Sequence, residues 1–186
     1  YADRLSRPGS FSPYIQYRRA VGYTAMNQDV PQHRLLDAWR ECQRHRHFID
    51  YALSSLERSL PLTGERLGLL SDAEIQSLDQ FVLRFGKLQD AIGARLLPSV
   101  LLYLQEPYED RPMLDKLHRL EKLGYIEDSE QWQALRMLRN RFAHEYPDDP
   151  DKNAAILMLA IESVLSLKNI LERIDQKLSL SSLSSS

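Results

Sequence analysis

Apolar residues recur at alternating steps of three and four from about residue 30 to residue 178, and no segment shows the two-residue alternation of a half-buried strand. Steps of three and four place side chains on one face of an α-helix, so each stripe predicts an amphipathic helix that must bury that face. Several long helices with short connections favour an antiparallel arrangement. The sequence therefore predicts an all-α fold, an antiparallel bundle of four to five helices.

The first two expected helices begin at recognisable caps. Asp29 and Pro31 can provide the cap and first-turn residue of the first helix, and Ser71 and Glu74 have capping-box spacing at the start of the second. The apolar stripes consist of Leu35, Trp39, Cys42, Ile49, Leu53, Leu56 and Leu60 in the first helix and of Ile75, Leu78, Val82, Phe85, Ile92 and Leu96 in the second.

Two polar residues interrupt these stripes. Arg46 and Gln89 occupy positions where apolar side chains are expected. They could line a cleft, although an arginine that extends its charge to solvent and a glutamine at a helix boundary are the more ordinary interpretations. Farther along the second helix, Gly93 and Pro98 predict a kink near residues 94–98.

Three further helices are predicted from their end signals. The third is expected over residues 110–124, where Gly124 can adopt the left-handed cap conformation. The fourth is expected from residue 128 until just before Pro147, and the fifth over residues 149–178. The apolar positions are Trp132, Leu135, Leu138 and Phe142 in the fourth helix and Ile156, Leu159, Leu167, Ile170 and Ile174 in the fifth.

Both ends of the chain are expected to lie outside the bundle, which then covers residues 26–178. Residues 1–25 predict an irregular basic leader, because prolines and glycines break every period. We expect the natural start at Met26, which would make this leader non-native or upstream sequence; a basic arm that folds over a partner is the alternative. Residues 179–186 are rich in serine and lack the variety to pack, which predicts a disordered tail.

Composition and charge restrict the compartment and the partners. Cys42 is the single cysteine, so no disulfide can form within the chain and a reducing compartment is the simpler expectation. We expect no apolar run near the roughly 18 residues that a membrane span needs, and no secretion signal. These expectations predict a cytoplasmic protein without membrane contact. The net charge of -2 provides no global basic field, so any nucleic-acid site must be local.

Several other chemistries find little support. His45 and His47 are two residues apart, whereas a helical zinc pair needs a spacing of four. The acidic stretch 148–151 is better explained as the cap and first turn of the last helix. Residues 117–132 resemble the helix and turn of winged-helix DNA-binding proteins, but another capped helix follows where the wing should be. We therefore expect neither a metal nor another cofactor.

The end of the fourth helix has the sequence RNRFAHEYP, residues 139–147. A step of four aligns Asn140 with His144, whereas Arg139 and His144 are separated by roughly 140° on an ideal helix. Arg139 and His144 can converge only if the helix distorts before Pro147 or if a symmetry-related copy supplies a second set. An arginine can bind a phosphate and a histidine can move a proton, which is what metal-free phosphodiester cleavage requires.

Spacing alone leaves a simpler interpretation open. Arg139 and Arg141 could form a solvated face, and His144 could cap the end of the helix. Arg136, one turn before Arg139, could contact a backbone phosphate or form an ion pair on the surface.

The motif resembles the signature of the HEPN superfamily, R-x4-6-H, and more closely the R-x4-H-x-Y form of HepT-like toxins. Arg139, His144 and Tyr146 match its three fixed positions, and Asn140 matches the polar residue that commonly follows the arginine. The helical pattern is also similar to that family over roughly residues 30–178, so the resemblance implies a HEPN-like bundle.

This resemblance implies a metal-independent endoribonuclease, the toxin of a toxin-antitoxin pair, which forms a homodimer with the Arg and His of both protomers in one cleft. It also implies a minimal nucleotidyltransferase antitoxin, MntA-like, that silences the toxin by adenylylating the motif tyrosine. The alternative is a non-catalytic HEPN protein that serves as the substrate-binding or scaffold partner of a nucleotidyltransferase. The expected site comprises Arg139 and His144 as catalytic residues, Asn140 as a supporting residue, Tyr146 as the modified residue, and Arg136 and Arg141 as candidate RNA contacts.

Overall fold

The computed structural model describes residues 13–142 and 149–184, with side chains from residue 30 on, and every regular element in these ranges is helical. The predicted all-α fold is confirmed. In chain order the elements are α1 (Pro13–Leu56), η1 (Glu57–Ser59), α2 (Gly64–Leu67), α3 (Asp72–Ala91), η2 (Ile92–Leu96), α4 (Leu97–Tyr103), α5 (Met113–Lys122), α6 (Ser129–Arg141), α7 (Pro150–Leu178) and α8 (Leu180–Leu183).

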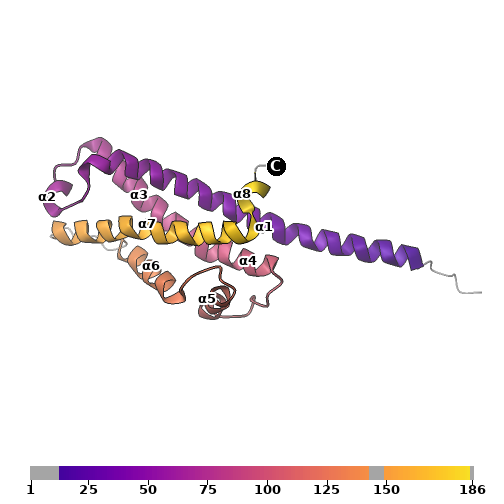
Figure 1. Cartoon of the computed structure of the whole chain (residues 1–186). Coiled ribbons are helices and arrows are strands. Elements are labelled where there is room, and N and C mark those ends of the chain that lie inside the picture. Colours follow the sequence, from indigo (N-terminus) through magenta and orange to yellow (C-terminus); the bar gives the residue numbers. More distant parts are fainter. Residues whose placement is uncertain (1–12, 143–148, 185–186) are drawn as a thin grey trace, which may run out of the picture.

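Long helices of alternating direction form the frame of the bundle. Figure 1 shows α1 and α6 running one way and α3 and α7 running the other, with the first part of α1 projecting beyond the bundle. α1 packs along α3, α6 contacts both α3 and α7, and α5 packs against α4 and α6. The helix that carries the start of the RNRFAHEYP motif, α6, therefore packs against α3 and α7.

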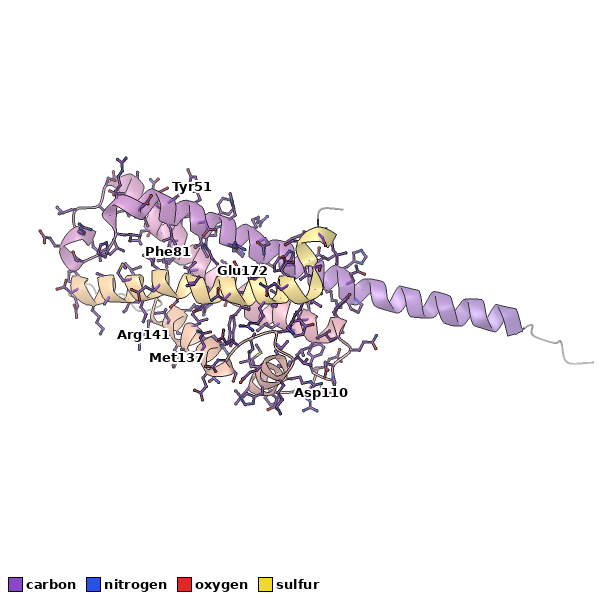
Figure 2. The ribbon with its side chains drawn as sticks, viewed as in Figure 1. Tyr51, Phe81, Asp110, Met137, Arg141 and Glu172 are labelled. Atoms are coloured by element: carbon purple, nitrogen blue, oxygen red, sulfur yellow. The ribbon has the colours of Figure 1, made fainter. Side chains whose placement is uncertain are left out.

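The core is one continuous apolar cluster to which all the long helices contribute. Phe81 and Phe85 of α3 are fully buried, and Phe81 is seen between α1 and α7 in Figure 2. The ring of Phe142, just after α6, meets the ring of Phe85 edge-on at a centroid distance of 5.8 Å. This contact attaches the end of α6 to the core.

Apart from the signal at Asp29 and Pro31, the cap signals in the sequence are confirmed. The N–H of Ser71 donates to the Glu74 carboxylate at 2.8 Å, and the N–H of Glu74 donates to the Ser71 hydroxyl at 3.4 Å. Gly124 has a φ of +74°, the left-handed conformation that ends α5. Asp128 and Asp149 accept hydrogen bonds from backbone N–H groups in the first turns of α6 and α7.

The predicted start of the first helix is wrong. Residues 13–25, expected to be irregular, belong to α1, and Pro31 lies inside that helix instead of at its start. Pro13 occupies the first helical position, where its missing N–H leaves no bond unmade. A single glycine such as Gly22 costs a helix only about 1 kcal/mol, which is too little to interrupt a long run of helix-forming residues.

The prediction of a disordered tail is wrong for residues 179–184. Ser179 adopts the left-handed conformation that ends α7, and the chain folds back into α8 so that Leu180 is buried. The Asp175 carboxylate accepts hydrogen bonds from the N–H and the hydroxyl of Ser181, at 2.8 and 2.6 Å. Ser179 and Ser181 therefore form a hydrogen-bonded turn between α7 and α8 instead of a flexible spacer.

The expectation that no apolar run is long enough to span a membrane is also wrong. α7 passes that test by length and composition, with a mean hydropathy of 1.8 over an 18-residue window. This is a weak indication, since the core helix of a soluble protein passes the same test. Ala160, Leu167 and Leu171 on one face of α7 are completely buried in the bundle core.

Candidate functional site

The helix that follows α3 departs from α geometry where a kink was expected. η2 is a π turn, in which the N–H of Leu97 donates to the carbonyl of Ile92, five residues back. Pro98 has no N–H to donate, and its ring clashes with the carbonyl of residue 94, so an ordinary α turn cannot continue through this point. π turns are frequent at functional sites.

A cavity of about 280 Å³ lies between this π turn and α6. Its buried side chains are Gln89 and Trp132, and Gly93 lies beside Trp132. Its exposed lining residues are Asp90, Ala94, Arg136, Arg139 and Asn140, and Met113 of α5 also contributes. Three of the six candidate site residues, at positions 136, 139 and 140, are therefore brought together at one opening.

Arg139 is held at the rim of the cavity by an ion pair. Its Nη2 atom donates to both carboxylate oxygens of Asp90, at 2.9 and 3.1 Å, and Nη1 donates to Oδ1 of Asn140 at 3.4 Å. The side chains of Arg139 and Asp90 are 43% and 53% exposed, and pairs this open to solvent stabilise a fold by only about 0–1 kcal/mol. The cation is oriented by Asp90 without being removed from solvent.

Gln89 anchors the floor of the cavity. It is 3% exposed, and its Nε2 atom donates to the carbonyl of Leu135 on α6 at 2.9 Å. Gln89 therefore fits the helix-boundary interpretation, since it lies in the last turn of α3 and bonds to α6, and it also lines the cavity. Arg46 behaves as its ordinary interpretation predicts, since it reaches outward to Glu172 of α7, with Nη2 3.9 Å from Oε1.

The other candidate residues do not lie at this cavity. Arg141 lies on another side of α6, in a surface depression shared with Lys152 and Leu159 of α7, and Figure 2 labels it there. His144 and Tyr146 fall in residues 143–148, outside the described part of the chain. The predicted convergence of Arg139 and His144 thus stays a prediction.

A second polar cluster links α1 and α3. His45 is buried, with Nδ1 3.3 Å from Nη1 of Arg84 and Nε2 3.9 Å from Oε1 of Glu41. Burial, reinforced by the positive charge of Arg84, lowers the pKa of His45. The guanidinium of Arg84 also lies 4.5 Å from the centre of the Phe48 ring. His45 therefore joins α1 to α3.

Across residues 30–142 and 149–184, no group of three or more His, Cys, Asp or Glu side chains could hold a metal ion.

The chain matches no family model, no curated protein and no solved structure. The similarity to the HEPN superfamily accordingly rests on the residues of the motif and on the helical pattern around it.

Proposed function

We propose that this chain is a HEPN-type, metal-independent endoribonuclease that acts as the toxin of a toxin-antitoxin pair. The observation that carries the proposal is the position of the first motif residues. Arg139 and Asn140 lie with Arg136 at the rim of a cavity, at the exposed end of α6, and lead directly into the segment 143–148 that contains His144.

Arg139 can serve as the phosphate ligand in spite of its ion pair. Both hydrogen bonds to Asp90 come from Nη2, so the N–H of Nε and the second N–H of Nη1 remain, and each could donate a single hydrogen bond to a phosphate. Because the pair is about half exposed, exchanging Asp90 for a phosphate loses little stabilisation. Arg136, one turn away, adds a second positive charge for the RNA backbone.

The proposed reaction is the transesterification of RNA. One His144 takes the proton of a ribose 2'-hydroxyl, and the oxygen attacks the neighbouring phosphorus while Arg139 stabilises the charge that builds on the phosphate. The bond from phosphorus to the 5'-oxygen breaks, and that oxygen receives a proton from His144 of the partner subunit of a homodimer. The products are a 2',3'-cyclic phosphate and a 5'-hydroxyl.

Regulation would act on Tyr146. An MntA-like nucleotidyltransferase would transfer AMP from ATP to the tyrosine hydroxyl and release pyrophosphate. The added phosphate and adenosine, two residues from His144, would place negative charge and bulk where the RNA phosphate must bind. Substrate would then be both repelled and excluded.

Cleavage of RNA by the purified, unmodified protein in the presence of a chelator tests this proposal. We expect cyclic phosphate ends, and at least about a hundredfold loss of rate in Arg139→Ala and in His144→Ala. Arg58→Ala is the matched control, because Arg58 is an exposed arginine of η1 that does not line the cavity. Wild-type protein that cuts no RNA, or a His144→Ala variant as active as the wild type, would overturn the proposal.

The second candidate is a non-catalytic HEPN partner of a nucleotidyltransferase, and the ion pair between Arg139 and Asp90 favours it, since an engaged arginine suits a structural role. This candidate predicts a stable complex and no RNA cleavage. The intact mass of the chain after co-expression with a nucleotidyltransferase distinguishes the two. Adenylyl increments on Tyr146 support the toxin, and their absence from a stable complex supports the partner.

A further inference from the structure

Positive charge is concentrated on three short stretches of the bundle. Residues 41–48 of α1, 83–90 of α3 and 136–140 of α6 together hold six arginines and lysines and two acidic residues, whereas the whole chain has a net charge of -2. α3 packs against both α1 and α6, so the three stretches belong to neighbouring helices. This concentration is the local basic surface that a nucleic-acid site on such a chain requires.

The side-chain contacts show that the stretches lie next to one another. Where α1 meets α3, Nδ1 of His45 lies 3.3 Å from Nη1 of Arg84. Where α3 meets α6, the Asp90 carboxylate accepts the hydrogen bonds of Arg139. Lys87 follows Arg84 by three residues and precedes Asp90 by three, a step that turns the side chain by about 60° on an α-helix. Lys87 is therefore exposed on the surface of α3 between its contacts with α1 and with α6.

The two carboxylates of these stretches are already paired. Asp90 pairs with Arg139, and Glu41 pairs with Arg95 of η2. Arg46 points to the other side of α1, where it pairs with Glu172 of α7. The exposed cations that no carboxylate of residues 30–142 and 149–184 pairs with are Arg44, Lys87 and Arg136. The surface therefore keeps an excess of positive charge after its ion pairs are formed.

The histidine between α1 and α3 responds to this charge. Burial lowers the pKa of His45, and the positive charges of Arg84, Arg44 and Lys87 lower it further, while Glu41 opposes them. Cations of both helices therefore act at the same point of the surface. A potential of one sign that extends over neighbouring elements attracts a ligand with many charges of the opposite sign.

A single RNA strand matches a surface of this kind. Its phosphates recur along an extended chain, and proteins bind such a chain with a row of arginine and lysine side chains. Packed helices lie about 8–10 Å apart, so the axes of α1 and α6 are up to about 16–20 Å from each other across α3. An acidic protein segment would also be attracted. The row ends at Arg139, the proposed ligand of the scissile phosphate, and this position favours the substrate.

We propose that the phosphates of a single RNA strand bind along a basic strip that runs from α6 across α3 to α1. The basic strip consists of Arg136, Arg139, Lys87 and Arg44. The inference rests on the proposed ribonuclease function, and it adds that substrate affinity depends on residues of α1 and α3 that lie outside the motif. Arg44 and Lys87 bind the strand away from the cut and take no part in the chemical step.

The salt dependence of RNA binding tests the basic strip without any cleavage. The probe is a fluorescein-labelled 2'-O-methyl oligouridylate, which lacks the 2'-hydroxyl that the proposed reaction needs. Its Kd is measured by fluorescence anisotropy between about 50 and 200 mM KCl, where phosphate contacts weaken steeply. Each contact with a single strand contributes about 0.7 to the slope of log affinity against log salt concentration. One lost contact should therefore reduce the change in Kd over this range about 2.6-fold.

Two exposed positions provide the variants. Arg44→Gln and Lys87→Gln should each reduce the salt effect by one contact, and the double variant should reduce it about sevenfold. Arg58→Gln is the matched control, because Arg58 is exposed on η1, outside the basic strip, and its replacement changes the net charge by the same amount. Its salt slope should equal that of the wild type. With cleavable RNA, the loss of kcat/KM in Arg44→Gln and Lys87→Gln should appear in KM, as expected for residues that bind without acting in the chemical step.

The outcomes separate this inference from the proposed function. Equal salt slopes for the wild type, Arg44→Gln and Lys87→Gln would overturn the basic strip, and RNA cleavage by the same proteins would leave the nuclease standing. Reduced slopes in both variants without any RNA cleavage would overturn the nuclease and leave an RNA-binding surface. Poly-glutamate that displaces the probe as effectively as unlabelled RNA of equal charge would overturn the RNA assignment in favour of an acidic protein segment.

Discussion

Replacing Gly93 with alanine should destabilise the bundle, although alanine is the better helix former. The new Cβ atom would lie 2.7 Å from Cζ2 of Trp132, and the indole is 1% exposed, with core residues behind it. Alanine in place of glycine stabilises a helix by about 1 kcal/mol. Overfilling a packed core costs about 1–3 kcal/mol. We therefore expect Gly93→Ala to lower the free energy of unfolding by up to about 2 kcal/mol.

Gly86 provides the matched control on the same run of helix. A Cβ atom there would have Cγ of Arg139 as its nearest neighbour, at 4.0 Å, which is an ordinary contact. Gly86→Ala should therefore change stability only through the higher helix propensity of alanine, and it should raise the free energy of unfolding by about 1 kcal/mol. For a chain of 186 residues this corresponds to a rise in Tm of about 2–4 °C.

Urea unfolding of both variants, followed by far-UV circular dichroism, measures the difference. Opposite signs for the two substitutions are expected, with the m-value unchanged. If Gly93→Ala gains as much stability as Gly86→Ala, the indole of Trp132 has room to move, and the tight contact that shapes the cavity floor would be refuted.

Burial, reinforced by the charge of Arg84, lowers the pKa of His45. The free energy of unfolding should therefore be highest above about pH 6.5. It should decrease as the pH falls from there toward the folded-state pKa, because the unfolded chain takes up the proton first. His45→Gln should remove this slope in urea titrations at a series of pH values, and a slope that persists would assign it to another group. Hydrogen bonds from two serine hydroxyls lower the pKa of Glu74 to about 2. The ionised carboxylate therefore stabilises the fold above its ordinary pKa of 4.5, and this stabilisation is lost as the pH falls toward 2. Glu74→Gln should make the free energy of unfolding depend less on pH in that range. An unchanged pH dependence would show that the capping box does not stabilise the fold. Arg139→Ala should cost less than about 1 kcal/mol of stability, because its ion pair is about half exposed. A loss of several kcal/mol in urea unfolding would identify Arg139 as a structural residue.

Helix ends were predictable because caps are local. Ser71 with Glu74, Gly124 and Asp149 each lie within a few residues of the backbone groups that they satisfy, so their spacing in the sequence is sufficient. The start of the first helix and the tail were not predictable in this way. Leu180 is buried by packing against other helices, a contact that composition does not reveal.

Periodicity identified the helices better than it identified their buried faces. Ile75 is 43% exposed in the first turn of α3, and Leu159 is 45% exposed on α7. α7 is apolar on more than one side, as the exposed Leu165 also shows, so the spacing of its apolar residues cannot select the face that packs.

The candidate site was predictable only where its residues share a helix. Spacings of three and four place Arg136, Arg139 and Asn140 on one side of α6, and the structure brings them together. Asp90 was missed, because its ion pair with Arg139 joins residues 49 positions apart in the sequence. The available signal was Gln89, which interrupts an apolar stripe directly before Asp90.

The π turn at Ile92–Leu96 holds one residue more than a helix of regular pitch would need. Each added residue advances the side-chain direction by roughly 100°. Leu97, Val100 and Leu101 are buried with that residue in place. Deleting Ala94 would rotate all three away from the interior. The burial of α4 therefore depends on the single extra residue in this turn, and losing that residue would require the packing of α4 against α1 to be rebuilt.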